Sequence, residues 1–558
     1  MPRRALPLLL LLSALGLSAV SHAAETFPMV KCHGHVLEDA SVTQIQRWYD
    51  AGSLSVRQVV QCYLDRVAQV DPYVNAVMEL NPDALEIADV LDAELKAGKK
   101  RGPMHGIVAL VKDNFATKDK MQTTAGSLAL VGSVVPRDAH VVKRMRESGV
   151  VILGHAGMSE WADMRSTSYS EGYSARGGQV RNSYNLTQEP GGSSSGSGHS
   201  VTTNMVTVAY GTETDGSVIS PAERGNIVGI KPTVGLTSRA GIIPESAHQD
   251  TVGAFGRTVE DAALALDAVF GFDWRDEATL EQLGKTPKSY AHFVSEKSSL
   301  KGMKVGIPWK RLCTALKVTS IRIIATCQHP DLFAPRVYNN TNYKYVDEIV
   351  SPAGWNWAFG PANQSEITVV NVDFYNNIKA YLSELGNTTI RSLEDIVAFN
   401  DAQAAEGGQP NIAAAFASGQ DGLLASLATG GIENSTYKQA LTWCRKTSRR
   451  DGIDYALHPI IDGKQVHLDA LLIPSDDNGA GTNIPAQAGY PIVTIPIGID
   501  EWHVPFGLSI VGTAWSEPTL IKFASAAQHA LGGRRVKPTF YAANATNIPV
   551  NWSFGTYL

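Results

Sequence analysis

Three stretches of the sequence carry side chains that could act together as a nucleophile and its base. Lys112 directly follows five apolar residues, 107–111, and Ser193 lies inside the glycine- and serine-rich run 190–198. Ser217 ends the stretch Gly-Thr-Glu-Thr-Asp-Gly-Ser, 24 residues after Ser193. A serine hydroxyl attacks an acyl group only when a base removes its proton, and a neutral lysine can be that base. The three residues indicate acyl transfer, provided that the fold brings them together.

Lys112 can act as a base only if its amine is neutral near physiological pH. A lysine at the end of a buried strand loses hydration, which favours the neutral amine. Lowering a lysine pKa from about 10.4 to about 7 corresponds to roughly 4–5 kcal/mol. A lysine at a strand end can equally extend into solvent, and the residue type alone does not decide between the two.

Ser217 follows a strand-like segment and a turn. Consecutive backbone amides in such a turn can bind the oxyanion of a tetrahedral intermediate, and we expect this of Thr214, Asp215, Gly216 and Ser217. The serine lacks the Gly-x-Ser-x-Gly elbow of α/β-hydrolases. The run 190–198 lacks the Lys-Ser/Thr ending of a phosphate-binding loop. Taken alone, that run can be a flexible linker and Ser217 an ordinary turn residue.

Together, the order and spacing of these stretches resemble the amidase signature family, whose hydrolases use a Ser–cisSer–Lys triad. Four further segments are similar to family landmarks and occur in the family's order: 229–236, 250–258 with the following Asp261, 487–491 and 505–512. The resemblance extends over about 41–531. It implies that Ser217 is the nucleophile, Ser193 the proton relay and Lys112 the base, with no metal and no cofactor.

The resemblance also suggests residues around the site. Trp161 stands where family members often line the acyl pocket, with a core tryptophan as the alternative. Ser194 is a candidate for substrate binding, or for orienting Lys112 or Ser193. Asp215 departs from the family, in which glycine is usual at this position, but oxyanion binding needs only its backbone.

The elements that must position these residues follow from the hydrophobic pattern. Short apolar runs alternate with helical stretches, which indicates an α/β fold whose sheet is covered on both faces; the expected strands lie near 107–111, 150–153, 205–209, 305–307, 471–473 and 492–497. Ser55 and Gln58 have capping-box spacing. Asn81-Pro82 is expected to start the next helix, with Asn81 as N-cap and Gly98 at its end. The resemblance implies one large domain with a mixed, twisted central sheet.

The first 23 residues differ in kind from the rest of the chain. Two arginines precede the apolar stretch 5–20, and the small residues Ser21 and Ala23 follow it. This pattern is typical of a cleaved secretory signal peptide, with an uncleaved anchor as the alternative. We therefore expect the amidase-like domain to span 24–558. An irregular insertion is expected at about 313–345, where prolines and clustered asparagines interrupt any periodicity.

Composition excludes several classes of protein. The 558 residues are 44% hydrophobic and 18% charged, which excludes a disordered chain. The net charge of −6, without a dense basic run, gives no electrostatic footprint for nucleic-acid binding. No stretch after the signal reaches about 18 uninterrupted apolar residues, so we expect no membrane span in the mature chain.

The cysteines and the N-glycosylation sequons give information on the cellular compartment of the protein. Five cysteines without CxxC spacing give no support to a zinc site and allow at most two internal disulfides. The signal peptide and the N-x-S/T sequons predict a secreted glycoprotein; the sequons are at Asn185, Asn339, Asn363, Asn387, Asn434, Asn544 and Asn551.

The sequence therefore predicts a secreted amidase that converts a small-molecule or peptide amide into a carboxylate and ammonia or an amine. Three alternatives are ammonia release from glutamine, as in glutamine-dependent amidotransferases, fatty-acid amide hydrolysis, and a secreted glycoprotein that binds without catalysis. Export argues against the first, and the lack of a membrane-binding helix in the mature sequence argues against the second. The retained Lys112, Ser193 and Ser217 argue against the third. The acyl group and the oligomeric state stay open.

Overall fold

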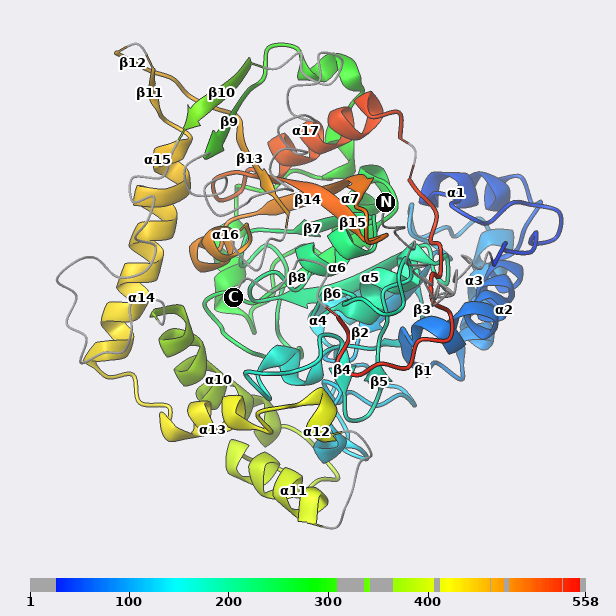
Figure 1. The fold of residues 1–558 in the computed structure, drawn as a ribbon. Coiled ribbons are helices and arrows are strands. Elements are labelled where there is room, and N and C mark those ends of the chain that lie inside the picture. Colours follow the sequence, from blue (N-terminus) through cyan, green and yellow to red (C-terminus); the bar gives the residue numbers. More distant parts are fainter. Residues whose placement is uncertain are drawn as a thin grey trace, which may run out of the picture.

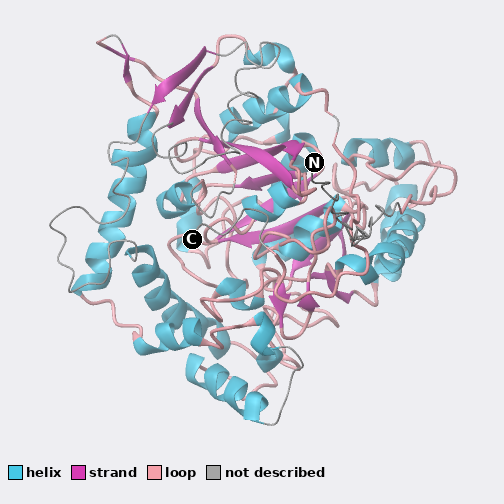
Figure 2. Ribbon diagram, viewed as in Figure 1, coloured by secondary structure: helices cyan, strands magenta, loops and turns pink. Residues whose placement is uncertain are grey.

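The computed structural model describes residues 27–308, 336–341, 365–405, 412–461, 463–475, 481–533 and 535–551. The expected signal peptide, 1–23, lies outside these ranges. So does the expected irregular segment 313–345, except for 336–341, which form a strand because Val337 and Tyr338 pair with the edge of the sheet. In the described part, strands form one large mixed sheet with helices around it (Figures 1 and 2), which confirms the predicted α/β class with a single large domain.

Eleven strands of the described residues form the main sheet, in the order β1-β3-β2-β6-β8-β7-β14-β15-β13-β9-β10. Neighbours are parallel in β3-β2-β6 and in β13-β9-β10, and antiparallel elsewhere. The bounds are β1 (Val77–Leu80), β2 (Val108–Lys112), β3 (Val151–Ala156), β6 (Val208–Glu213), β7 (Val228–Lys231), β8 (Thr251–Gly256), β9 (Lys304–Pro308), β10 (Arg336–Thr341), β13 (Ala470–Pro474), β14 (Ile492–Ile499) and β15 (Pro505–Val511). Two short ribbons pair β4 (Tyr173–Ser174) with β5 (Gly178–Gln179), and β11 (Ile460–Ile461) with β12 (Lys464–Gln465).

Helices from different parts of the chain cover the two faces of this sheet. Side chains of successive strand residues point to opposite faces. On β6, the Tyr210 hydroxyl donates to the carbonyl of Ala265 in α7 (Val259–Asp267), whereas Gly211 lies directly against Ser194, the N-cap of α5 (Ser195–Thr202). Helices α5 and α7 therefore lie on opposite faces. Helix α6 (Ile219–Arg224) packs beside α5, and α17 (Glu517–Ala530) beside α7.

Other helices surround this core (Figure 1). Ser55 caps α2 in a capping box with Gln58, which confirms the prediction. The remaining helices are α1 (Val42–Asp50), α2 (Val56–Val74), α3 (Ala84–Lys96), α4 (His140–Glu147), α10 (Ser365–Ser383), α11 (Leu393–Ala405), α12 (Ile412–Ala415), α13 (Asp421–Ala428), α14 (Ser435–Ser448), α15 (Asp454–Ala456) and α16 (Asn483–Ala488).

All six expected strands are present, and two predicted starts differ from the structure by two residues or more. Helix α3 begins at Ala84 and not at Pro82, because the Asn81 carboxamide is used in a turn: it accepts the Asp83 amide and donates to the carbonyl of Ile152. Strand β6 begins three residues later than expected, because the Met205 amide still bonds back to the carbonyl of Ser200 after α5.

A disulfide joins Cys32 to Cys62, and Cys444 is a buried free thiol. Cys313 and Cys327 lie outside the described residues. Within the described ranges, no helix is long and apolar enough to cross a membrane.

Candidate functional site

The three residues singled out in the sequence meet at one edge of the sheet. Lys112 is the last residue of β2, and its parallel neighbour β6 ends one residue after Thr212. Because parallel strands end at the same edge, both ends open towards the loop that carries Ser217. Ser193 immediately precedes Ser194, the N-cap of α5. The sheet edge and the start of this helix thus bring together residues that are up to 105 positions apart in the chain.

Hydrogen-bonding distances connect the three side chains into a chain of polar groups. Lys112 Nζ lies 2.7 Å from Ser193 Oγ, and Ser193 Oγ lies 3.0 Å from Ser217 Oγ. Lys112 and Ser193 are completely buried, whereas Ser217 is 4% exposed and lines a cavity. A proton can pass along such a chain from the hydroxyl at the cavity to the buried amine.

The surroundings of Lys112 suit both of its protonation states. Its Nζ also lies 3.0 Å from Thr212 Oγ1 and 3.3 Å from the carbonyl of Thr212. An ammonium can donate to all three oxygens, and a neutral amine can donate to the two of Thr212 while its lone pair accepts from Ser193. Burial lowers the pKa of Lys112 to about 8, and the negative charge of Asp163 limits this decrease. A substantial fraction of the amine is therefore neutral in mildly alkaline solution.

Close backbone packing fixes Ser193 and its neighbours. The peptide bond between Gly192 and Ser193 is cis. A Cβ atom at residue 192 would overlap the carboxylate of Glu171, so a larger residue there would have to displace that side chain. Ser194 donates its hydroxyl to the Thr212 carbonyl at 3.0 Å and its amide to the Ser217 carbonyl at 3.3 Å. These bonds link the start of α5 to both β6 and the Ser217 turn.

A buried carboxylate shapes the turn that carries Ser217. Glu213 Oε2 accepts the amides of Val218 at 2.7 Å and Ile219 at 3.0 Å. Burial raises the pKa of Glu213, and Lys231 together with these amides and that of Gly216 opposes the increase. The two bonds hold the backbone that follows Ser217 against the end of β6.

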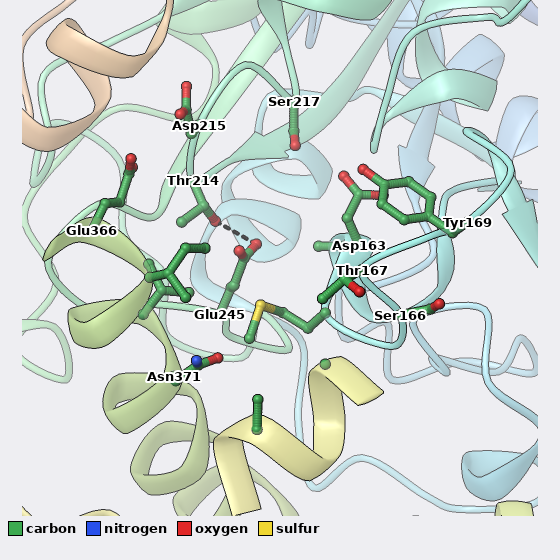
Figure 3. Close-up of a pocket in the computed structure, with 16 residues that line it drawn as sticks. Asp163, Ser166, Thr167, Tyr169, Thr214, Asp215, Ser217, Glu245, Glu366 and Asn371 are labelled. Carbon is green, nitrogen blue, oxygen red and sulfur yellow. Dashed lines mark hydrogen bonds between the residues drawn. The ribbon is translucent and has the colours of Figure 1, made fainter. Parts of the chain in front are cut away.

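A cavity of about 420 Å³ opens beside Ser217 (Figure 3). Figure 3 shows the Ser217 hydroxyl facing the cavity, with Asp163 and Tyr169 on one side and Thr214 and Glu245 on the other. The far wall is mainly apolar and is formed by Met164, Ile367, Val370, Gly422 and Ala425. The cavity can therefore hold an organic acyl group next to the serine hydroxyl.

Two predicted substrate-binding residues do not line this cavity. Trp161 is 2% exposed and packs in the main hydrophobic core, and Ser194 is completely buried and bonded to Thr212. Both positions favour the alternatives that the sequence left open, a core tryptophan and a serine that orients its neighbours. Packing explains the tryptophan, and tying α5 to β6 explains the serine.

Sequence reasoning missed several residues of the site. Thr212 and Glu213 lie within the Gly-Thr-Glu-Thr-Asp-Gly-Ser stretch, but their side-chain roles depend on contacts with Lys112 and with residues after Ser217. Glu245 lies outside the three stretches from which the catalytic residues were predicted. These residues become neighbours of the site only in the folded chain, so their roles cannot be predicted from the local sequence.

Comparisons with known proteins agree with this geometry. Residues 58–329 match the family model described as Amidase. The chain is 54% identical to a putative amidase of Schizosaccharomyces pombe, covering 95% of this chain and 91% of that protein. It is 40% identical to a probable amidase of Arabidopsis thaliana, covering 88% and 90%. Among solved structures, the native peptide amidase from Stenotrophomonas maltophilia has a TM-score of 0.77 and 36% identity, covering 90% of this chain and 99% of that one.

Proposed function

This chain belongs to the amidase family and hydrolyses amide carbon–nitrogen bonds, and on that premise we propose that it works through an acyl-enzyme on Ser217. Ser193 relays protons, and Lys112 is the base. The observation that carries the proposal is the continuous path of 2.7 Å and 3.0 Å from Lys112 through Ser193 to a serine that lines a cavity.

The first half of the reaction forms the acyl-enzyme. Ser217 gives its proton to Ser193 while Ser193 gives its own proton to Lys112, and Ser217 Oγ bonds to the amide carbonyl carbon. The carbonyl π electrons move to the oxygen. When the tetrahedral intermediate collapses, the carbon–nitrogen bond breaks and the proton on Lys112 returns through Ser193 to the leaving nitrogen.

The second half hydrolyses the ester of Ser217. A water molecule gives a proton to the same relay and its oxygen attacks the acyl carbon. The bond to Ser217 Oγ then breaks, and the relay returns the proton to that oxygen, which releases the carboxylic acid. The oxyanion of each intermediate is held by turn amides. We assign this role to the amides of Thr214, Asp215, Gly216 and Ser217, which belong to the turn that carries the nucleophile.

We also propose that the protein is secreted after cleavage of residues 1–23, and that it is glycosylated. Sequons Asn387, Asn434, Asn544 and Asn551 have exposed asparagines. Asn185 is 5% exposed and donates its side-chain amide to the carbonyl of Trp502, so a glycan does not fit there in the folded chain. Mass spectrometry of the secreted protein tests both points, through its N-terminal residue and its glycopeptides.

The decisive test of the chemistry combines active-site labelling with turnover. We expect a fluorophosphonate probe to label the wild-type protein and not the Ser217→Ala variant. Hydrolysis of short aliphatic, aryl, long-chain and C-terminal peptide amides should be lost in the same variant. Peptide amides belong in the panel because the Stenotrophomonas maltophilia relative is a peptide amidase.

Two further variants complete this experiment. Ser193→Ala keeps the nucleophile but breaks the path to Lys112, so labelling should persist at a much lower rate. Ser298→Ala removes a hydroxyl from an exposed serine and should change neither labelling nor turnover. A folded Ser217→Ala protein that hydrolyses the panel at the wild-type rate would contradict the proposal.

A further inference from the structure

The walls of the Ser217 cavity carry acidic side chains and, among the described residues, no basic one. The described lining residues include the four acids Asp163, Asp215, Glu245 and Glu366, and none of them is a lysine, arginine or histidine. Burial raises the pKa of all four, and those of Asp215 and Glu245 well above the ordinary value, so the cavity presents an acid-rich surface in which Asp163 carries the charge most readily. An acyl group that bore a carboxylate would be repelled.

Protein donors contact two of these carboxylates. Glu366 accepts side-chain amides from Gln249 at 2.7 Å, from Gln487 at 3.0 Å and from Asn483. Asn483 also donates to Asp215 at 3.1 Å. These contacts occupy both oxygens of Glu366, whereas Oδ1 of Asp215 accepts no hydrogen bond from the described residues. Figure 3 shows the Asp215 carboxylate directed away from the Ser217 hydroxyl, so Asp163 and Glu245 are the carboxyl groups that face the cavity.

Asp163 and Glu245 keep hydrogen-bonding capacity that the described residues do not use. The Oδ1 atom of Asp163 is buried and accepts no hydrogen bond from them. Within the same ranges Glu245 accepts only the Thr214 hydroxyl, at 2.7 Å, and that hydroxyl lies 2.6 Å from Asp250. One hydroxyl hydrogen can serve only one carboxylate. Asp250 has two further donors, the amides of Glu245 and Ser246, so Glu245 is the less satisfied of the two.

The backbone before the cavity wall is shaped to place Asp163 there. Trp161, Ala162 and Asp163 have φ angles of 55°, 54° and 82°, which are unusual for three consecutive residues other than glycine. This turn buries Trp161 in the core while Ala162 and Asp163 line the cavity. Burial raises the pKa of Asp163 to about 6, so its carboxyl is mainly ionised at neutral pH. A negative charge thus lies beside Ser217 without a cationic side chain on the described lining.

We propose that this cavity selects amides whose acyl group carries a primary ammonium, which Asp163 binds from one wall while Glu245 faces it from the other. The substrate class is therefore an aminoacyl amide. The inference rests on the proposed function, because it assumes that the scissile carboxamide lies at Ser217. The ammonium supplies the donors that Asp163 and Glu245 lack, and the apolar far wall accepts the remaining carbon chain.

Isosteric substrate pairs test this inference directly. We would compare amides with one to five methylene groups that end in an ammonium with the amides of the same length that end in a methyl group, at neutral pH. A bound ammonium should raise kcat/KM over the methyl isostere by at least about tenfold at the best chain length. Because both members of a pair share the carboxamide and the enzyme, the ratio of their kcat/KM values isolates recognition of the charge.

Two variants assign the effect to its residues. Asp163→Asn should reduce the ammonium-to-methyl ratio by about tenfold or more, and Glu245→Gln should reduce it by a smaller factor. The charge of Asp163 also acts on Lys112, but that effect changes both members of a pair and cancels in the ratio. Asp65→Asn, at an exposed position of α2, is the matched control and should leave the ratio at its wild-type value.

The outcomes separate this inference from the proposed function. Methyl amides that are hydrolysed as fast as their ammonium partners would overturn the inference and leave the acyl-enzyme mechanism standing. A wild-type preference that survives in both Asp163→Asn and Glu245→Gln would overturn the assignment of these walls. If either variant fails to fold, the other variant and the wild-type ratio still decide. An enzyme that hydrolyses no member of either series would contradict the proposed function as well.

Discussion

Two lysines of this protein, Lys112 and Lys231, are both completely buried at the last residue of a strand in the same sheet. Burial lowers the pKa of each. Their partners differ. Lys112 contacts two hydroxyls and one carbonyl, and one of those hydroxyls leads to Ser217 at the cavity. Lys231 donates to the carbonyls of Tyr490 at 2.6 Å and Pro485 at 3.4 Å.

Nearby carboxylates oppose the decrease in pKa of both lysines, so the hydrogen-bond partners make the difference. The carboxylates are Asp163, Glu245, Asp250 and Glu171 for Lys112, and Glu213, Asp215 and Glu517 for Lys231. The partners of Lys231 are the two carbonyls. Its carbonyl partners can only accept, so they favour the ammonium. Hydroxyls can accept or donate, so the partners of Lys112 tolerate loss of its proton. A buried strand-end lysine is therefore suited to be a base or a structural cation according to the groups that it contacts.

The largest effect that separates the two lysines is expected for Lys112→Met. Methionine keeps the length and the apolar contacts but cannot accept a proton, so kcat/KM for amides should fall at least about a thousandfold. The thermal unfolding midpoint should fall by no more than a few degrees, because burial of the Lys112 amine is itself unfavourable and the substitution removes it. Steady-state kinetics and thermal unfolding measure the two quantities. Near-normal turnover by this variant would end the assignment of Lys112 as the base.

Lys231→Met should show the opposite pattern. The substitution removes the positive charge near the buried carboxyl groups of Glu213 and Glu517. It also leaves the carbonyls of Tyr490 and Pro485 without their donor, and the loss should cost about 1–3 kcal/mol of stability. Urea unfolding measures the loss. Turnover per folded molecule should fall far less than in Lys112→Met, because no reacting proton passes through Lys231.

A double substitution sharpens the result for Lys231. Adding Glu213→Gln to Lys231→Met removes the unpaired carboxylate, so the double variant should be more stable than the sum of the two single losses predicts. If the change in the free energy of unfolding of the double variant equals the sum of the two single changes, Glu213 and Lys231 do not interact. Lys231 would then not be a structural cation for Glu213.

The two lysines also show which features of the site can be predicted from the sequence. Lys112, Ser193 and Ser217 were predicted because the order and spacing of three stretches together resemble the amidase signature family, and strands β2 and β6 beside them appear as short apolar runs. Lys231 ends an apolar run just as Lys112 does, and no local pattern separates their environments. The difference arises from residues around 485–490, which are distant in the chain and become neighbours of β7 only through β14.

The cavity walls could not be predicted for a related reason. Asp163 reaches the cavity because residues 161–163 adopt positive φ angles, and none of the three is a glycine that would have indicated this conformation in the sequence. Glu245 comes from a separate loop. Trp161 looked like a pocket residue, but the same turn directs it into the core. Such positions depend on packing that overrides local preference.

The pH dependence of activity should distinguish the lysines by sign and position. Lys112 must be neutral to accept a proton, so kcat/KM for an uncharged amide should rise with pH and reach half of its alkaline plateau near pH 8. Lys231 should add no step, because its proton takes no part in the reaction. A profile that is flat from pH 6 to 10 would contradict the role of Lys112.

Stability should respond to the same titration. The pKa of Lys112 falls from 10.5 to about 8 on folding, so the unfolded chain binds more protons between these values. The free energy of unfolding should therefore rise with pH across that window, by up to roughly 3 kcal/mol from this residue. Lys112→Met removes this contribution, and urea unfolding of both proteins at a series of pH values measures the difference.

The smallest effect is expected for Thr212→Val. The valine lacks the hydroxyl that accepts from Lys112 and from Asn114, each at 3.0 Å, while the shape of the side chain is retained. Loss of an acceptor disfavours the ammonium, so the acid limb of kcat/KM should move to lower pH, and kcat should fall about tenfold because the amine is less well oriented. Thr212→Ser keeps the hydroxyl and should restore both quantities. The acceptors of Lys231 are main-chain carbonyls, which no side-chain substitution removes. If the acid limb of the kcat/KM profile moves to another pH when residue 212 is changed, the titrating group is Lys112 and not Lys231.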